Sequence, residues 1–293
     1  MEHKSYVLIT PARNEEAFIE KTIQSVISQT VLPKKWVIVS DGSTDRTDEI
    51  VKKYLPDHPW IELIRMPEHR DRSFAAKATC FNAGYQTVKN FKYDIIGNLD
   101  ADITFEHNYY ENILTEYCEN AKLGIAGGMV LELRGEKFRT LNYNLNSVAG
   151  AIQLFTKKCF EEIGGYIPLK MGGIDAVAEI MARMHSWEVR SFKDITVYHH
   201  RCIGTTNENI FYSRFRYGIR DYSFGTHPLF MFLKYLDRLR NKPYIIGSLL
   251  MLSGYLWAWT RREKRPVSDA VVKYVQREQM DRIISAFNNQ RRK

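Results

Sequence analysis

Short apolar runs alternate with segments of helical period through the first 100 residues, and this alternation limits the fold more than any other feature of the chain. The strand-length runs cover residues 6–9, 36–39, 60–65 and 94–99, and the helical segments cover residues 15–29, 47–54 and 75–88. Strands that alternate with helices usually pair in parallel, with the helices packed on the sheet. The pattern therefore predicts an α/β fold with a doubly wound, mostly parallel sheet and helices on both faces. Asn14 is the expected cap of the first helix.

The later part of the chain continues this pattern and then changes character. Further helices are expected over residues 109–119, 156–163 and 175–186, and further strands over residues 123–133, 149–155, 188–192 and 196–198, while periodicity fades between residues 134 and 146. A chain of 293 residues suits one large core with an appended segment. We expect an α/β domain over residues 1–202 and a helical C-terminal extension over residues 203–293.

Charge is divided unevenly between these two regions. Residues 201–293 carry 18 Lys or Arg against 7 Asp or Glu, whereas the first 200 residues carry 24 against 27. A basic, aromatic-rich segment indicates either nucleic acid or an anionic membrane surface as a partner. Because the segment has no zinc-finger spacing, ribonucleoprotein signature or basic heptads, we expect no nucleic-acid partner and favour lipid.

The cysteines indicate a reducing environment. Cys80, Cys118, Cys159 and Cys202 are far apart, form no Cys-x-x-Cys motif and follow no secretory leader. We therefore expect free thiols and a cytoplasmic location.

Two carboxylates, Asp100 and Asp102, follow the run at residues 94–99. Side chains alternate along an extended segment, so both carboxylates face the same way and can share a divalent cation with a phosphate. The ordinary alternative is a solvated Asp-rich loop, and the rest of the chain must decide. Polar segments at residues 10–16 and 40–45 also follow strands, and the carboxyl ends of parallel strands form one ligand-binding edge. We expect all three segments to line one crevice.

Three segments, in this order and spacing, carry a resemblance to a known family. They read Pro-Ala-Arg-Asn-Glu-Glu from residue 11, Val-Ser-Asp-Gly-Ser-Thr-Asp from residue 39 and Leu-Asp-Ala-Asp from residue 99. They resemble the motifs of bacterial-type family 2 glycosyltransferases with the GT-A fold, over roughly residues 5–200. The resemblance implies metal-dependent, inverting transfer of a sugar from a nucleotide-diphosphate donor, most often a uridine one, to an acceptor hydroxyl.

The resemblance also implies the donor site. By position, the nucleoside would be surrounded by the loop formed by Thr10, Pro11, Ala12, Arg13 and Glu15, and Asp41 would accept the imide N–H of the base. Arg72 or Lys77 would contact the base or a phosphate. Asp100 with Ala101 would hold the ribose, and Asp102 would bind Mn or Mg. Asp41 could instead form an Asx-turn or a helix cap, and Arg72 and Lys77 could be solvated charges.

The acceptor side depends on an acidic residue near residue 175. The segment from Gly172 resembles the family segment in which an acid opens an acceptor-facing helix, so Asp175 is the expected catalytic base. Ile174 stands where the family often has a first acid. Glu179, one turn later on the same face, is the fallback, and Asp175 could also simply cap the helix.

A histidine pair follows the last predicted strand. Members of the fold often supply a histidine to the metal here, so His199 and His200 are both candidate ligands. Adjacent residues on an extended segment point to opposite sides, so we expect only one to reach the ion and favour His199.

The C-terminal region contains 18 uncharged residues, 243–260, between clusters of cations. A transmembrane helix needs about 20 apolar residues, so a full span is marginal. We favour a helix lying in or dipping into the interface of an anionic membrane, anchored by Tyr244, Tyr255, Trp257 and Trp259. A buried hairpin or a homodimer contact is the alternative. Membrane attachment predicts a peripheral location on the inner face of the cell membrane and a polyprenyl-linked or other glycan acceptor.

Two other functions remain open from the sequence. A sugar-nucleotide pyrophosphorylase has a related sheet but normally carries a Gly-rich loop after the first strand, and residues 10–16 contain no glycine. A catalytically silent, membrane-bound scaffold would not need Asp41, Asp100, Asp102 and Asp175 together. The donor sugar, the acceptor and the linkage do not follow from these motifs.

Overall fold

The computed structural model describes residues 4–68, 74–140, 144–201, 209–240 and 243–290. The chain divides into two compact units. The first, Met1–Lys170 with Ile174–Thr205, contains the sheet, and the second, Met171–Gly173 with Thr206–Lys293, is helical.

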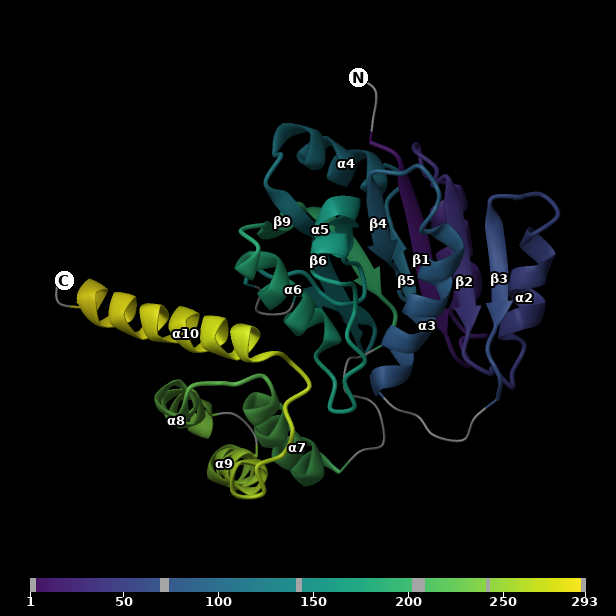
Figure 1. Cartoon of the computed structure of the whole chain (residues 1–293). Helices are drawn as coiled ribbons and strands as arrows, with labels where there is room; N and C mark the ends of the chain where they lie inside the picture. Colours follow the sequence, from purple (N-terminus) through teal and green to yellow (C-terminus); the bar gives the residue numbers. More distant parts are fainter. Residues whose placement is uncertain (1–3, 69–73, 141–143, 202–208, 241–242, 291–293) are drawn as a thin grey trace. The chain divides into compact units, whose positions relative to one another are not determined.

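The first unit is built on one mixed sheet (Figure 1). The strands are β1 (Tyr6–Ala12), β2 (Lys35–Ser40), β3 (Ile61–Arg65), β4 (Ile95–Asn98), β5 (Ile103–Phe105), β6 (Leu123–Arg134), β7 (Lys137–Thr140), β8 (Leu154–Thr156) and β9 (Glu188–His199). Their order is β3-β2-β1-β4-β8-β6-β9-β5, with β7 paired to β6. Strands β3, β2, β1 and β4 are mutually parallel and β9 is parallel to β6, whereas β8 and β5 run antiparallel to their neighbours. The predicted α/β fold with a mainly parallel sheet is confirmed.

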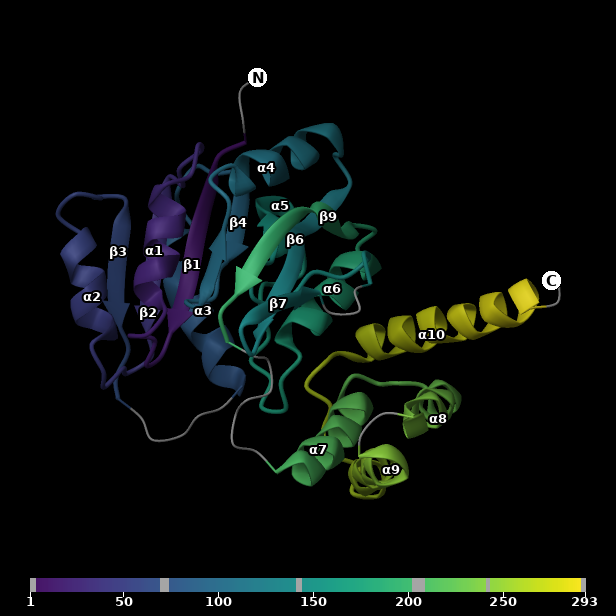
Figure 2. The same ribbon diagram turned by 180° about the vertical axis from the view of Figure 1, so that it is seen from behind.

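Helices cover both faces of this sheet, as predicted. They are α1 (Ile19–Ile27), α2 (Thr47–Tyr54), α3 (Phe74–Val88), α4 (Tyr109–Glu119), α5 (Lys157–Glu162) and α6 (Ile174–Met184). Figure 1 shows α3 in front of the strands, and Figure 2, the view from behind, shows α1 in front of them. In α1 the fully buried Ile19, Ile23 and Val26 recur at helical spacing, so one apolar stripe faces the core.

The first helix begins later than the sequence predicted, because Asn14 is not its cap. Asn14 has a left-handed backbone with φ of 55°, and its side-chain oxygen accepts the N–H of Thr44. Residues 16–18 form a turn, and α1 starts only at Ile19. Asn14 instead fastens the loop after β1 to the loop after β2.

Three strand predictions also differ from the structure. Residues 149–152 form a turn closed by the hydrogen bond from Ile152 N–H to the Ala149 carbonyl, so only Leu154–Thr156 is strand. The two late strands are one strand, β9, with an irregularity opposite Gly128. Strands β5 and β7 were not predicted, because three and four residues are too short to show a period of two.

The second unit contains α7 (Ile210–Ser223), α8 (Pro228–Asp237), a 3-10 turn at Arg238–Arg240, α9 (Tyr244–Thr260) and α10 (Asp269–Gln290). Its core is a cluster of buried side chains from α7, α8 and α9: Ile219, Tyr222, Met231, Tyr235, Met251, Tyr255 and Ala258. Asp221 is buried beside this cluster and accepts hydrogen bonds from Lys234 Nζ at 2.8 Å and Tyr235 OH at 2.9 Å. The paired lysine compensates the cost of burying the carboxylate.

One predicted membrane anchor is part of this core. Tyr255 is 4% exposed, and its hydroxyl donates to the Thr226 carbonyl at 2.8 Å, so the prediction for this residue is wrong. No helix among the described residues has the length and apolar character needed to cross a membrane.

Candidate active site

Asp100 and Asp102 lie in the short connection from β4 to β5. Ile103, the first residue of β5, pairs with His199, the last residue of β9. This register places Asp102 Oδ2 at 3.2 Å from His199 Nε2, and both residues are buried. Strand pairing therefore joins two residues that are 97 positions apart in the chain.

Arg201 links this pair to the first loop. Its Nη2 lies 2.5 Å from Glu15 Oε2 and its Nε lies 3.6 Å from Asp102 Oδ2. Burial alone would raise the pKa of Asp102, but His199, Arg201 and Lys77 outweigh it and lower that pKa. Asp102 is therefore a carboxylate that keeps its negative charge although it is almost completely buried.

The two candidate histidines point to different surroundings. His199 has a pKa above its usual value, because the hydrogen bond and charge of Asp102 outweigh the lowering effect of burial. Its buried Nδ1 has no hydrogen-bond partner among the described residues. His200 Nε2 lies 2.8 Å from Thr104 Oγ1, and burial lowers its pKa. Only His199 is paired with the Asp102 carboxylate, which favours it over His200 as a ligand.

Asp100 is held from the other side by Lys77 and by a turn at Gly150. Lys77 Nζ lies 2.5 Å from Asp100 Oδ1 and donates to the Gly150 carbonyl at 3.0 Å. Asn98 Nδ2 donates to the same carbonyl at 2.6 Å, and Asp100 N–H donates to the Ala151 carbonyl at 2.9 Å. Lys77 is therefore neither a solvated charge nor a free cation, since it binds the Asp100 carboxylate.

Asp175 meets the same turn. It lies in the first turn of α6, half-buried, and a methyl group added at Gly150 would lie 2.8 Å from Asp175 Oδ2. Any larger residue at position 150 would therefore force the Asp175 side chain to shift. Gly150 thus connects the Asp100 side of the site with Asp175.

Glu179, the fallback base, is committed to other contacts. It is 4% exposed and accepts hydrogen bonds from Val148 N–H at 2.7 Å and Ser147 Oγ at 3.1 Å. Burial raises its pKa to about 7, although the Val148 N–H, Arg183 and Ser147 act in the opposite direction. Glu179 fixes the segment that leads into the Gly150 turn, and Asp175 is the more accessible of the two acids.

The expected nucleoside loop is partly strand. Thr10, Pro11 and Ala12 belong to β1, and the fully buried Thr10 hydroxyl accepts a hydrogen bond from Trp36 Nε1 at 2.9 Å. The loop itself begins at Arg13, whose Nη1 lies 3.5 Å from Asp41 Oδ2. Glu15 N–H donates to Thr47 Oγ1, and burial raises the pKa of the Glu15 carboxyl to about 7 despite Arg201. The loops after β1 and β2 therefore form one hydrogen-bonded unit beside Asp41.

Some residues of the site were not predicted from the sequence, and one predicted residue lies outside the described part of the chain. Arg201 followed the histidine pair directly, so its charge was a usable signal, whereas Gly150 and Asn98 gave none. The Ala101 carbonyl accepts a hydrogen bond from the Thr22 hydroxyl at 2.8 Å. Arg72 lies outside the described residues.

The donor set beside Asp102 fits a hard divalent cation. Within the described ranges, no group of three or more His, Cys, Asp or Glu side chains could hold a metal by itself. Mg²⁺ commonly takes one or two protein carboxylates and completes its shell with phosphate oxygens and water. Asp102 and His199, with its otherwise unpartnered imidazole, therefore fit a Mn or Mg ion that binds together with a diphosphate.

Comparison with known sequences identifies the family. A family model, Glycosyl transferase family 2, matches residues 7–177, more than half of the chain. The chain belongs to glycosyl transferase family 2. The matched region includes β1 from Val7 onward, the loop after β2, the Asp100–Asp102 connection and Asp175.

Named relatives of this family 2 chain match only in part. Poly-beta-1,6-N-acetyl-D-glucosamine synthase of Staphylococcus epidermidis is 24% identical over 170 residues, 52% of this chain and 39% of the relative. The 4,4'-diaponeurosporenoate glycosyltransferase of Staphylococcus aureus is 31% identical over 124 residues, 42% of this chain and 31% of the relative. The matched region thus spans about two fifths or less of these relatives.

Solved structures show the same fold. Mannosyltransferase PcManGT from Pyrobaculum calidifontis, in complex with GDP-Man and Mn²⁺, has a TM-score of 0.58 at 14% identity, covering 99% of this chain and 88% of that chain. S. aureus TarS 1-349 in complex with UDP-GlcNAc has a TM-score of 0.56 at 13% identity, covering 86% of this chain and 71% of that chain. At these identities the likeness concerns the fold, which is the GT-A fold predicted from the sequence.

Proposed function

We propose that this family 2 protein is a metal-dependent, inverting glycosyltransferase that moves a sugar from a uridine-diphosphate donor to an acceptor hydroxyl. The observation that carries the proposal is the arrangement around Gly150. Through Lys77 and Asn98 it joins Asp100 on the donor side to Asp175 on the acceptor side. A donor-binding carboxylate and a candidate base held by one turn support a single displacement, which needs donor and acceptor to be fixed next to each other.

The donor would be bound by residues from three loops. Asp41 accepts the imide N–H of the base, Asp100 holds the ribose, and the loop from Arg13 to Glu15 closes over the nucleoside. Asp102 and His199 would hold a Mn or Mg ion, which neutralises charge on the leaving diphosphate. His199, and after it Arg201, keep Asp102 ionised when no cation is present.

Asp175 would then act as the general base. Its carboxylate takes the proton of the acceptor hydroxyl while that oxygen forms a bond to the anomeric carbon. The bond from this carbon to the donor phosphate oxygen breaks, and the nucleoside diphosphate leaves with the electron pair. One displacement inverts the anomeric configuration.

The acceptor we propose is a lipid-linked glycan or polysaccharide precursor, and the protein would act peripherally on the inner face of the cell membrane. The concentration of positive charge in residues 201–293 supports this location.

A thermal-shift panel tests the donor proposal. UDP, UDP-GlcNAc, GDP-Man and matched nucleotide sugars are added to the full chain with Mn²⁺ or with a chelator. A ligand at a free concentration of about 100 times its Kd stabilises the folded protein by about 2.7 kcal/mol, which is readily measured as a rise in Tm. We expect uridine donors to raise Tm only with Mn²⁺ and Asp41→Ala to lose this preference. A panel in which no nucleotide sugar raises Tm would contradict the proposal.

A further inference from the structure

Helix α9 is apolar around its whole circumference. Residues 244–260 contain no charged side chain, and the helix has two distinct faces. A helix that is apolar on all sides is normally buried in a large core or in a membrane. The environment of each face therefore requires an explanation.

The inner face of α9 is closed by α7. A methyl group at Gly218 of α7 would lie 1.9 Å from the Met251 carbonyl oxygen, and one at Gly254 would lie 2.0 Å from the Phe215 carbonyl oxygen. The two backbones are therefore in direct contact, and Met251, Tyr255 and Ala258 are buried beside them. This face is fully used inside the second unit.

The outer face is uncovered. Five side chains spaced along it are 43 to 61% exposed, and we call them the outer stripe: Ile245, Ile246, Leu249, Leu256 and Trp259. Ile245, Leu249, Leu256 and Trp259 follow helical spacing on one side. An exposed apolar stripe of this length marks an interaction surface.

The contact with α7 limits how α9 can meet a bilayer. A helix of 17 residues is about 25 Å long, less than the roughly 30 Å of a hydrocarbon core. Insertion of α9 would also draw in α7, which carries Arg214, Arg216 and Arg220. Charges in the bilayer centre are costly, so neither a span nor a deep dip is compatible with this packing.

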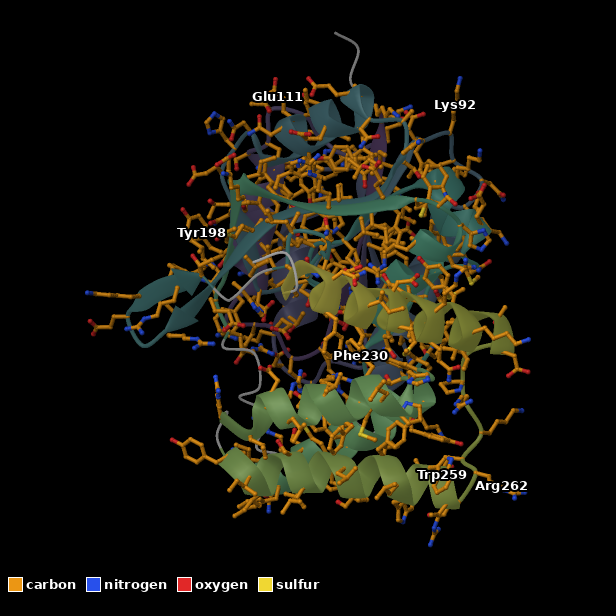
Figure 3. The ribbon with its side chains drawn as sticks, turned by 90° about the vertical axis from the view of Figure 1, so that its left-hand side faces the viewer. Lys92, Glu111, Tyr198, Phe230, Trp259 and Arg262 are labelled. Carbon is orange, nitrogen blue, oxygen red and sulfur yellow. The ribbon has the colours of Figure 1, made fainter. Side chains whose placement is uncertain are left out.

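We propose that the outer stripe of α9 docks flat on an anionic membrane, within the interfacial layer. Exposed cations flank both ends of the helix: Arg240 before it, and Arg261, Arg262 and Lys264 after it, with Glu263 and Asp237 as the acidic neighbours. Figure 3 shows Trp259 and Arg262 at the same end of α9. Lipid phosphates complement such cations, while aromatic rings favour the headgroup level.

A second copy of the chain fits this face less well. If two α9 helices paired through their outer stripes, either parallel or antiparallel, Arg240, Arg261 and Arg262 would meet like charges at both ends. Like charges directly opposite one another disfavour association.

Docking on a membrane deepens the proposed function and rests on it for a lipid-borne acceptor.

Cosedimentation with vesicles tests the docking surface on the full-length protein. The vesicles are phosphatidylcholine alone or phosphatidylcholine with 30% phosphatidylglycerol. We expect binding to the anionic vesicles, a blue shift of tryptophan emission, and at least tenfold weaker binding for Ile245→Glu/Leu249→Glu. Arg261→Gln/Arg262→Gln should weaken binding to anionic vesicles several-fold, and added salt should do the same.

The matched control is Leu32→Glu/Phe91→Glu. Both residues are exposed and apolar like the outer stripe, at 46 and 44%, but belong to the first unit. We expect this variant to bind vesicles like the unaltered protein. Equal binding of Ile245→Glu/Leu249→Glu and Leu32→Glu/Phe91→Glu would overturn the proposal. No vesicle binding at all, or a dimer that Ile245→Glu/Leu249→Glu dissociates, would also overturn it.

Nucleotide binding separates this inference from the proposed function. Ile245→Glu/Leu249→Glu should keep the Mn²⁺-dependent rise in Tm with the donor, which also shows that the variant is folded. Intact donor binding without vesicle binding refutes only the docking surface. Vesicle binding without any donor response refutes only the proposed function.

Discussion

At the level of single residues, four carboxylates of this site differ in their partners. Asp102 is paired with His199 and Arg201, Asp100 is paired with Lys77, and Glu179 is bonded to backbone. Asp175 is half-buried, as Asp100 is, and it packs against Gly150. This division supports different roles for acids that look equivalent in the sequence.

Lys77 provides the first prediction at this scale. Lys77→Met should raise KM for the donor about tenfold, because a charge-assisted contact that positions Asp100 contributes about 1.5–3 kcal/mol. The effect on kcat should be smaller, since Lys77 positions a binding residue. Initial rates over a range of donor concentrations measure both values, and a fall in kcat with unchanged KM would refute the assignment.

The hydrogen bonds of Glu179 lead to a second prediction, which concerns stability. Glu179→Ala removes the acceptor for the Val148 N–H and the Ser147 hydroxyl inside the core, and should lower the free energy of unfolding by about 2–3 kcal/mol. Glu179→Gln keeps an acceptor oxygen of the same shape and serves as the control. Urea unfolding at pH 5 should show a loss of less than about 1 kcal/mol for this variant; similar losses for both would contradict the hydrogen-bond account.

The raised pKa of Glu179 predicts how the stability difference between wild type and Glu179→Gln changes with pH. Glu179 has a folded pKa of about 7 against an ordinary 4.5, so the folded protein holds this proton more tightly than the unfolded chain. The resulting stability is fully present below pH 4.5 and is lost as pH rises through 7. Glu179→Gln lacks this loss, so the variant should gain up to about 3 kcal/mol relative to wild type between these pH values. A constant difference would mean that the pKa of Glu179 is the same in the folded and the unfolded chain.

The sequence predicted the site residues that belong to motifs and missed those that tertiary structure supplies. Asp41, Asp100 and Asp102 follow strands, which made them visible in a pattern of strand ends. The Gly150 turn had no such signal, because Ala149 and Ala151 made it look like a strand. Its role comes from Lys77 and Asn98, which are more than 50 positions away.

At the scale of elements, the contact between α7 and α9 leads to a further prediction. Gly218→Ala or Gly254→Ala places a methyl group about 2 Å from a backbone oxygen, which no side-chain rotation can relieve. We expect a loss of about 2–3 kcal/mol in the free energy of unfolding. Gly247→Ala is the control in α9, because its methyl group would lie nearest to side-chain atoms, the Pro243 ring at 3.0 Å and Arg214 Nε at 3.7 Å. Equal effects of all three changes would show that the helices do not pack in this way.

Element prediction succeeded where burial produces a clear period. The bounds of α2 and α4 equal the predicted ranges, since each buries one stripe between polar faces. The start of α1 was predicted four residues too early, because Asn14 is held by Thr44, a contact between two loops. The apolar character of α9 was visible in the sequence, but the division into an inner and an outer face depends on α7.

On the scale of the whole molecule, two units carry opposite net charge. The strand-and-helix unit contains the acidic residues of the candidate site, and the helical unit contains most of the excess Lys and Arg. This separation fits a protein that binds its donor in one unit and a charged surface with the other.

We propose that Asp175 acts as the base of the transfer step and does not itself bind the donor. Asp175→Asn is therefore tested for binding of a uridine-diphosphate donor with Mn²⁺ and for sugar transfer, on one preparation. We predict donor affinity within about twofold of wild type and transfer about 10²–10⁴-fold slower. Transfer at the wild-type rate, or loss of donor binding together with transfer, would contradict the account.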